Sequence, residues 1–213
     1  MVKEEKRIKQ FVFEQQLQAE YWDWEKEKLL WFEHWKENKN LIFQEIYQRL
    51  KSVETKKVTL SSLALIIHDK DKNDLGEMIF PHVHTYAKFS DKRTLSRLAR
   101  VIGIKEQYIE YPKNGNKYFE ENQLAYLIHA QQPEKYHYKP KDVETFHTFD
   151  YLKFFKTNQK KFEKQSATAR RKNVDKNWDW VNQQILKGKL FLEDILADDN
   201  LFLLYSNHKL QFK

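Results

Sequence analysis

Two histidines, His82 and His84, stand two residues apart in a segment that alternates between apolar and polar residues, His82 to Phe89. Such alternation predicts a β-strand, and side chains two apart on a strand point to the same face of a sheet. The two imidazoles can therefore share one cation, provided that further ligands complete the site. Two ordinary surface histidines are the alternative interpretation of this short pattern.

A second group of possible metal ligands lies at the end of an apolar run, Ser62 to His68. This run predicts a buried central strand. Asp69 and Asp71 follow it directly. If this strand neighbours the strand with the histidine pair, His68 and one of the aspartates reach the same cation. Three imidazole nitrogens and one carboxylate oxygen suit Mn²⁺ or Mg²⁺ and leave Zn²⁺ open. A solvated turn is the alternative interpretation of the aspartates.

One tyrosine lies outside the apolar stripe of a predicted helix, residues 117–129. Leu124 and Ile128 are four residues apart and form the stripe that faces the core. Tyr126 is two residues from each, about 200° round the helix, so it points away from the core and towards the side of His129. A boundary tyrosine with its hydroxyl in water is the alternative.

The elements that position these side chains predict an α+β fold. Their order is strand, helix, strand, strand, helix, strand, helix, which is close to the split βαβ plan of ferredoxin-like and RRM-like domains. We therefore expect a central antiparallel sheet with helices on one face and the histidines on the uncovered face. The predicted ranges are 7–14, 20–51, 62–68, 82–89, 92–102, 107–111 and 117–129, with Gly103 ending the fifth element.

Two stretches add detail to this layout. The predicted helix 20–51 carries Trp22, Trp24, Trp31 and Trp35, which we expect to pack against the sheet, and a break is expected near Asn38–Asn40. From Lys156 the chain becomes polar and basic, which predicts a linker or an exposed helix. A short helical segment, residues 178–212 with a break at Gly188, follows it and is too small to bury a core alone.

The composition of the 213 residues restricts the classes of partner that the protein can bind. There are 38 Lys and Arg against 31 Asp and Glu, a net charge of +7, which favours nucleic acid or an acidic membrane surface. Cysteine is absent, so disulfides and thiolate metal sites are excluded. No apolar run reaches the length of a membrane span and no apolar core follows the charged N-terminus, so we expect a cytoplasmic protein without membrane contact.

Three motifs in this order, HDKD at residues 68–71, PHVH at 81–84 and AYLIH at 125–129, resemble the HUH endonucleases, named for a His–hydrophobic–His triplet. Within them the chain looks most like the replication initiators of small Gram-positive rolling-circle plasmids. The resemblance covers the layout of about residues 7–149. The long Trp-rich helix and the short C-terminal region depart from that pattern, and the latter puts an oligomerisation domain of the family's type in doubt.

The resemblance implies the roles of individual residues. His68, Asp71, His82 and His84 match the metal ligands, with Asp69 a lesser candidate. Tyr126 matches the nucleophile that forms a 5′-phosphotyrosine with single-stranded DNA, and His129 is a candidate base for it. Tyr136 and Tyr138 are weaker candidates for the nucleophile. Lys88, Lys92 and Arg93, with the basic segment Arg170–Lys172, are candidates for DNA contacts.

The resemblance also implies partners and a division of the chain. Residues 1–149 would form the origin-binding and nicking domain, and residues 150–213 a basic linker with a small helical segment. Single-stranded and hairpin origin DNA and the host replication machinery would be the partners, with a homo-oligomer left open. A relaxase or transposase of the same superfamily is one alternative, and a non-catalytic RRM-like binding module is another.

Overall fold

A five-stranded antiparallel sheet forms the centre of the protein, with the strand order β4-β1-β3-β2-β5. The computed structural model describes residues 5–188, except 74, 114–115, 133 and 148, together with 191 and 193. The strands are β1 (Arg7–Gln16), β2 (Leu60–His68), β3 (His82–Thr94), β4 (Ile109–Glu110) and β5 (Glu144–Phe146). The α-helices are α1 (Lys26–Leu29), α2 (Trp35–Lys51), α3 (Leu95–Ile102), α4 (Phe119–Tyr126) and α5 (Tyr151–Leu186).

The order of the elements along the chain confirms the predicted α+β class. Strand β1, helix α2, strands β2 and β3, helix α3 and strand β4 follow the split βαβ plan. β1 and β2 pair with β3 from either side, both antiparallel, so β3 is the central strand. β5, which the sequence pattern did not predict, extends the sheet beyond β2.

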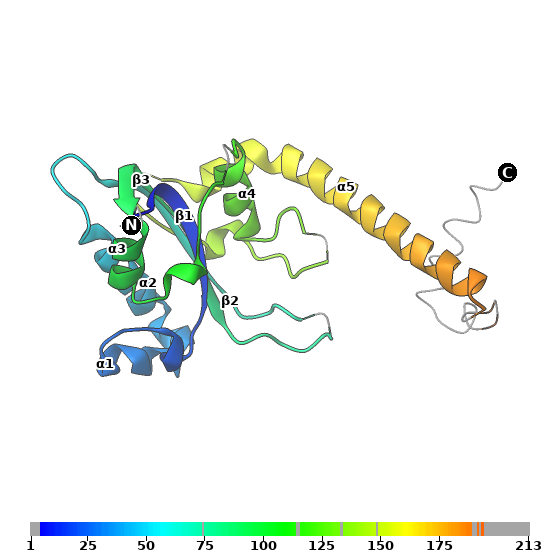
Figure 1. Cartoon of the computed structure of the whole chain (residues 1–213), viewed down its shortest axis with the longest axis horizontal. Coiled ribbons are helices and arrows are strands. Elements are labelled where there is room, and N and C mark those ends of the chain that lie inside the picture. The colour runs from blue at the N-terminus through cyan, green and yellow to red at the C-terminus, as the bar shows by residue number, and fades with distance from the viewer. Residues whose placement is uncertain are drawn as a thin grey trace.

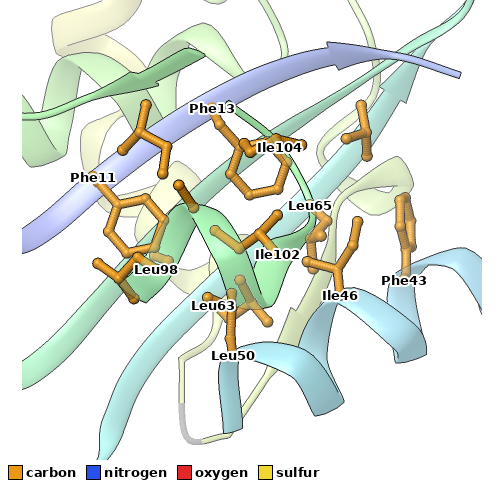
Figure 2. Packing of buried hydrophobic residues seen from close by; sticks show 14 of the residues in the cluster. Phe11, Phe13, Phe43, Ile46, Leu50, Leu63, Leu65, Leu98, Ile102 and Ile104 are labelled. Carbon is orange, nitrogen blue, oxygen red and sulfur yellow. The ribbon is translucent and has the colours of Figure 1, made fainter. Parts of the chain in front are cut away.

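One face of the sheet carries the main apolar core. Phe11 and Phe13 from β1 and Leu63 and Leu65 from β2 point to the same side, as the two-residue period of a strand requires. Figure 2 shows them packed against side chains of α2 and α3, and each is at most 1% exposed. Trp22 and Trp24 are buried in this cluster, and Trp31 and Trp35 pack at its edge, as predicted.

The opposite face is also partly covered, contrary to the expectation of an open sheet. A second cluster joins Ala64, Ile66 and Tyr86 of the sheet to side chains of α4 and of the start of α5. The physical reason is that Leu124 and its neighbours on α4 need an apolar partner, and the small Ala64 leaves room for them. The histidine face is therefore a sheltered surface and not an open platform.

Several predicted boundaries differ from the structure. The Trp-rich stretch consists of short helical turns, and α2 begins after His34 and runs unbroken through residues 38–40. β3 continues to Thr94, so α3 starts three residues later than predicted. Gly103 ends α3 with φ +85°, as expected, and a Cβ there would lie 2.7 Å from Trp24 Cδ1.

The long helix α5 starts against α4 and then extends away from the sheet (Figure 1). Its first turns are held by Phe162, which is buried, and by the Lys161–Glu121 ion pair. The structure does not describe the side chains at 166–180 or the chain after 193, so the predicted tail and the roles of Arg170–Lys172 lie outside the described part. No helix in the described part combines the length and apolarity needed to span a bilayer.

Candidate metal centre and neighbouring tyrosine

Strand register brings three histidines together on the α4 side of the sheet. His68, the last residue of β2, lies directly opposite His82, the first residue of β3, and His84 lies one strand period further along. The ring of His68 is 5.4 Å from that of His82 and 4.2 Å from that of His84, centroid to centroid. The prediction that His82 and His84 share a face is confirmed, and their rings are 4.9 Å apart.

Asp71 lies at the centre of this group. Its Oδ2 is 3.4 Å from His68 Nδ1 and 3.7 Å from His82 Nε2. The same oxygen is 3.6 Å from Nε2 of a fourth histidine, His129. Two overlapping groups, one of His68, His82 and His84 and one of His68, Asp71 and His129, have ligand atoms within 4.8 Å of one another. Of the two candidate aspartates, Asp71 and not Asp69 belongs to them.

Backbone carbonyls orient the imidazoles. His68 Nε2 lies 2.8 Å from the carbonyl of Leu127, His82 Nδ1 2.8 Å from that of Phe80, and His129 Nδ1 2.8 Å from that of Tyr136. A ring nitrogen that donates to a carbonyl leaves the lone pair on the other nitrogen, which in all three rings faces Asp71. The tautomers follow from this hydrogen-bond pattern.

Two of those inward nitrogens fit a cation. His68 Nδ1 and His129 Nε2 are buried and have no hydrogen-bond partner among the described residues. Buried polar atoms are nearly always satisfied, so unpaired lone pairs on converging imidazoles match a metal site better than a packed core. All four histidines of the cluster and Asp71 are at most 7% exposed.

The charge states of the cluster also suit a cation. Burial acts to raise the pKa of Asp71, but the adjacent imidazoles of His68 and His82 outweigh it and hold that pKa well below its usual range. Burial, and then the charge of His68, lowers the pKa of His129 to about 4. Burial likewise holds the pKa of His84 well below its usual value. An ionised carboxylate beside neutral imidazoles is the state that metal ligands require.

His82 differs from the other two titrating histidines. Burial lowers its pKa, but the nearby carboxylate of Asp71, a hydrogen bond with the carbonyl of Phe80 and the charge of Glu14 raise it overall. Glu14 of β1 lies opposite His84 in the register, with its carboxylate oxygens 3.3 Å from His84 Nε2 and 3.6 Å from His82 Nε2. No local pattern indicates Glu14, because its approach to the histidines depends on the pairing of β1 with β3.

Tyr138 fixes the carboxylate of Asp71. Its hydroxyl donates to Asp71 Oδ1 at 3.2 Å and accepts from the Lys70 backbone N–H at 2.9 Å. Its ring stacks on His68, with centroids 4.3 Å apart and planes 6° from parallel. Burial raises the pKa of Tyr138, so its hydroxyl stays protonated and keeps donating. The sequence pattern did not identify this supporting role.

Tyr126 lies beside the cluster, at the end of α4. Its ring centroid is 5.5 Å from that of His84 and 5.0 Å from that of His129. Lys135 Nζ donates to Tyr126 Oη at 2.6 Å and lies 4.9 Å from the ring centroid. Burial lowers the pKa of Lys135, but the hydrogen bond with Tyr126 raises it overall, so this amine is a cation. Lys135 was not among the residues that the sequence pattern indicated.

His129 faces the carboxylate rather than the tyrosine hydroxyl. The helix ends at Tyr126, and a left-handed residue follows, since His129 has φ +55°. This turn swings the imidazole back towards Asp71, whereas a helix continuing to residue 129 would keep it on the outer face. The placement supports a ligand position for His129 more than the predicted role of a base.

The three basic residues predicted to contact DNA do not join the cluster. Lys88 forms a 2.6 Å ion pair with Glu120 of α4. Arg93 is buried and donates to the carbonyl of Val58 at 3.2 Å. Lys92 is exposed near the far end of β3, about 33 Å along the strand from His82 at the usual rise per residue. Their contacts with DNA stay a prediction.

Fold and site together define an α+β domain with a sheltered candidate centre for a divalent cation beside a tyrosine. Comparison with known proteins identifies the family to which the chain belongs. Residues 43–152, just over half of the chain, match the model of the plasmid replication protein, origin binding domain, and the chain belongs to this family. It is also similar to a "Replication protein" of Onion yellows phytoplasma (strain OY-M), with 27% identity over 117 residues. That match covers 50% of this chain and 29% of the relative.

Proposed function

We propose that the chain initiates plasmid replication as a metal-dependent nuclease of the HUH type, which nicks and rejoins one strand of origin DNA. The observation that carries this proposal is the convergence of His68, His82, His84 and Asp71 beside the hydroxyl-bearing ring of Tyr126. A purely structural role for these residues would leave unpaired buried nitrogens in the core. Membership of the origin-binding family supports DNA as the partner.

We assign the cation to His68, Asp71, His82 and His84, with His129 as a further ligand. A donor set rich in imidazole favours Mn²⁺ over Mg²⁺, which prefers oxygen ligands and retains water. When bound, the cation supplies Lewis-acid stabilisation of the negative charge at the scissile phosphate. The carbonyls of Leu127, Phe80 and Tyr136 and the hydroxyl of Tyr138 keep the ligand atoms aligned for it.

Tyr126 acts as the nucleophile. Its Oη forms a bond to phosphorus while the bond from phosphorus to the 3′ oxygen breaks, which leaves a 5′-phosphotyrosine and a free 3′-hydroxyl. The phenol releases one proton and the departing 3′ oxygen takes one up, so the step is balanced. Lys135 donates to Oη and places a positive charge where negative charge develops as the proton leaves.

The products match the needs of initiation. A 3′-hydroxyl can prime synthesis by a host polymerase, and the phosphotyrosine retains the bond energy for rejoining the strand. Single-stranded or hairpin origin DNA is the proposed substrate. The candidate ligands are at most 7% exposed, and an unpaired strand can bring its phosphate to such a recessed site more easily than a paired duplex can.

The direct test is a covalent capture assay. We expect the wild-type protein with Mn²⁺ and a random-sequence pool of single-stranded DNA to give a protein–DNA adduct that survives denaturation. Tyr126→Phe should reduce adduct formation by at least about 10⁴-fold while Mn²⁺ affinity stays the same, since the nucleophile is lost and the ligands remain.

Tyr47→Phe is the matched control, because Tyr47 lies on α2 and stacks on Phe146, away from the cluster. It should form the adduct at the wild-type rate. Adduct from the Tyr126→Phe protein would assign the nucleophile to another residue. DNA binding without any adduct, at equal strength with and without Mn²⁺, would identify a non-catalytic binding module instead.

A further inference from the structure

A pocket of about 610 Å³ borders the candidate centre on the side of β1. His84, Tyr126 and Glu14 form the wall that it shares with the cluster. Its size is within the range of small-ligand sites. If a phosphate sits at Tyr126, the nucleotide next to it along the strand reaches this pocket.

Half of the residues that line the pocket are glutamines and tyrosines. Glutamines come from three separate elements, and two tyrosines add flat aromatic surface: Gln16, Gln107, Gln123, Tyr21 and Tyr108. An amide can both donate and accept, which suits the edge of a nucleobase, and a tyrosine ring can stack on its face.

The charges of the pocket argue against a phosphate as its occupant. Glu14 and Glu110 are the charged residues that line it, and neither lysine nor arginine is among the lining residues in the described part of the chain. Carboxylates repel a phosphate, but they accept hydrogen bonds from an amino group. The lining therefore suits an uncharged ring that carries an exocyclic amino group, as adenine, cytosine and guanine do and thymine does not.

Two buried polar atoms border the pocket from the other face of the sheet. Thr85 lies opposite Phe13 and Gln15 is two residues from Phe13, so both side chains point away from the histidine face. Gln15 is 5% exposed and Thr85 is 1% exposed, and both line the pocket. Gln15 Oε1 and Thr85 Oγ1 have no hydrogen-bond partner within the described ranges. Beyond Phe13 no described strand pairs with the outer edge of β1, because β4 pairs only with Val12 and Phe13, although the Gln16 carbonyl accepts from Trp22 Nε1 at 2.7 Å. Buried polar groups are rarely left unpaired unless something else binds them.

We propose that this pocket holds one unpaired base of the scissile strand, adjacent to the phosphate attacked by Tyr126, and makes nicking selective for an amino-bearing base at that position. Gln107 and Gln123 read the edge of the base, Tyr108 supports its face, and the carboxylates disfavour thymine. This inference rests on the proposed nicking function and adds the residues that choose where the strand is cut.

The test is to sequence the DNA products of nicking. Wild-type protein and Mn²⁺ are mixed with a random-sequence pool of single-stranded DNA, and both the adducts and the released 3′-hydroxyl fragments are sequenced. We expect one position beside the nick to be enriched in an amino-bearing base and depleted of thymine. Gln123→Ala and Gln107→Ala should each reduce this enrichment on the order of tenfold, the value of a good base contact.

Gln44→Ala is the control, because Gln44 is an exposed glutamine of α2, outside the pocket. It should keep the wild-type enrichment. If a glutamine variant gives too few adducts to sequence, the same comparison is made by equilibrium binding. The selected strand and its thymine variant are then bound to proteins that also carry Tyr126→Phe. Gln107 is exposed, so its variant should fold even if that of Gln123 does not.

The outcomes separate this inference from the function on which it rests. Absence of adduct from the wild-type protein would overturn the nicking function itself. Adducts with no base preference beside the nick, or a preference unchanged in both glutamine variants, would overturn the pocket assignment and leave nicking intact. Enrichment of thymine would contradict the role of the carboxylates.

Discussion

The face of the sheet under α2 and α3 buries Phe11, Phe13 and Leu63, whereas the other face of the same strands buries His68, His82 and His84. The first face is filled by apolar side chains of the sheet and of α2 and α3. The second face encloses two imidazole nitrogens, His68 Nδ1 and His129 Nε2, that have no hydrogen-bond partner in the described part of the chain. The two-residue period of one strand can therefore place an apolar core on one side and candidate metal ligands on the other.

The largest effect on stability should come from the apolar face. Phe11→Ala should lower the free energy of unfolding by about 3–5 kcal/mol, because Phe11 is fully buried and its loss leaves a cavity. Urea unfolding followed by circular dichroism measures this. Mn²⁺ affinity of the folded fraction should not change. Val12 is the next residue along β1 and is half-buried on the other face. Val12→Ala should lower the free energy of unfolding by only about 1–2 kcal/mol. An equal loss of stability in the two variants would show that the two faces do not differ in this way.

The histidine face should respond to metal instead. Mn²⁺ at about 100 times its dissociation constant should raise the free energy of unfolding by about 2.7 kcal/mol, because the folded state alone presents the converged ligands. A chelator should reverse the gain. Thermal melts with and without Mn²⁺ measure it, and identical melting temperatures would show that the cluster holds no cation.

Removing one ligand should separate metal affinity from stability. His84→Ala should weaken Mn²⁺ binding by about 100-fold, measured by calorimetric titration, with a change in metal-free stability below about 1 kcal/mol. The small change follows because burial already disfavours the charged form of His84, whose pKa is held low. His34→Ala, an exposed histidine before α2, is the control and should bind Mn²⁺ normally. Unchanged affinity in His84→Ala would remove His84 from the site.

The smallest effect is expected from a residue that only supports a ligand. Tyr138→Phe should reduce Mn²⁺ affinity about tenfold, because Asp71 Oδ1 loses the hydroxyl that donates to it while the ring still stacks on His68. The same titration measures the loss. A loss as great as that of His84→Ala would mean that Tyr138 does more than orient the carboxylate.

The main core and the candidate site also differ in how much of each could be predicted from the sequence. Alternation along residues 82–89 places His82 and His84 on one face because strand geometry is local, and the structure confirms it. The apolar periods of α2 and α3 likewise predict the main core. Local periodicity therefore predicts most of the fold and the face on which the site lies.

The rest of the site depends on contacts between distant segments. Glu14 reaches the histidines only through the pairing of β1 with β3, and Lys135 and Tyr138 reach it through a loop without periodicity. His129 was placed on the outside of a helix, but the helix ends at Tyr126 and a left-handed turn redirects the imidazole. No pattern in the sequence encodes these placements.

The histidine face is proposed to bind one cation beside Tyr126. Anomalous diffraction from crystals soaked in Mn²⁺ tests it most directly. One anomalous peak within bonding distance of His68 Nδ1, His82 Nε2 and Asp71 Oδ2 is the predicted result. A structure in which the soaked ion binds elsewhere, with these side chains turned apart, would contradict the account.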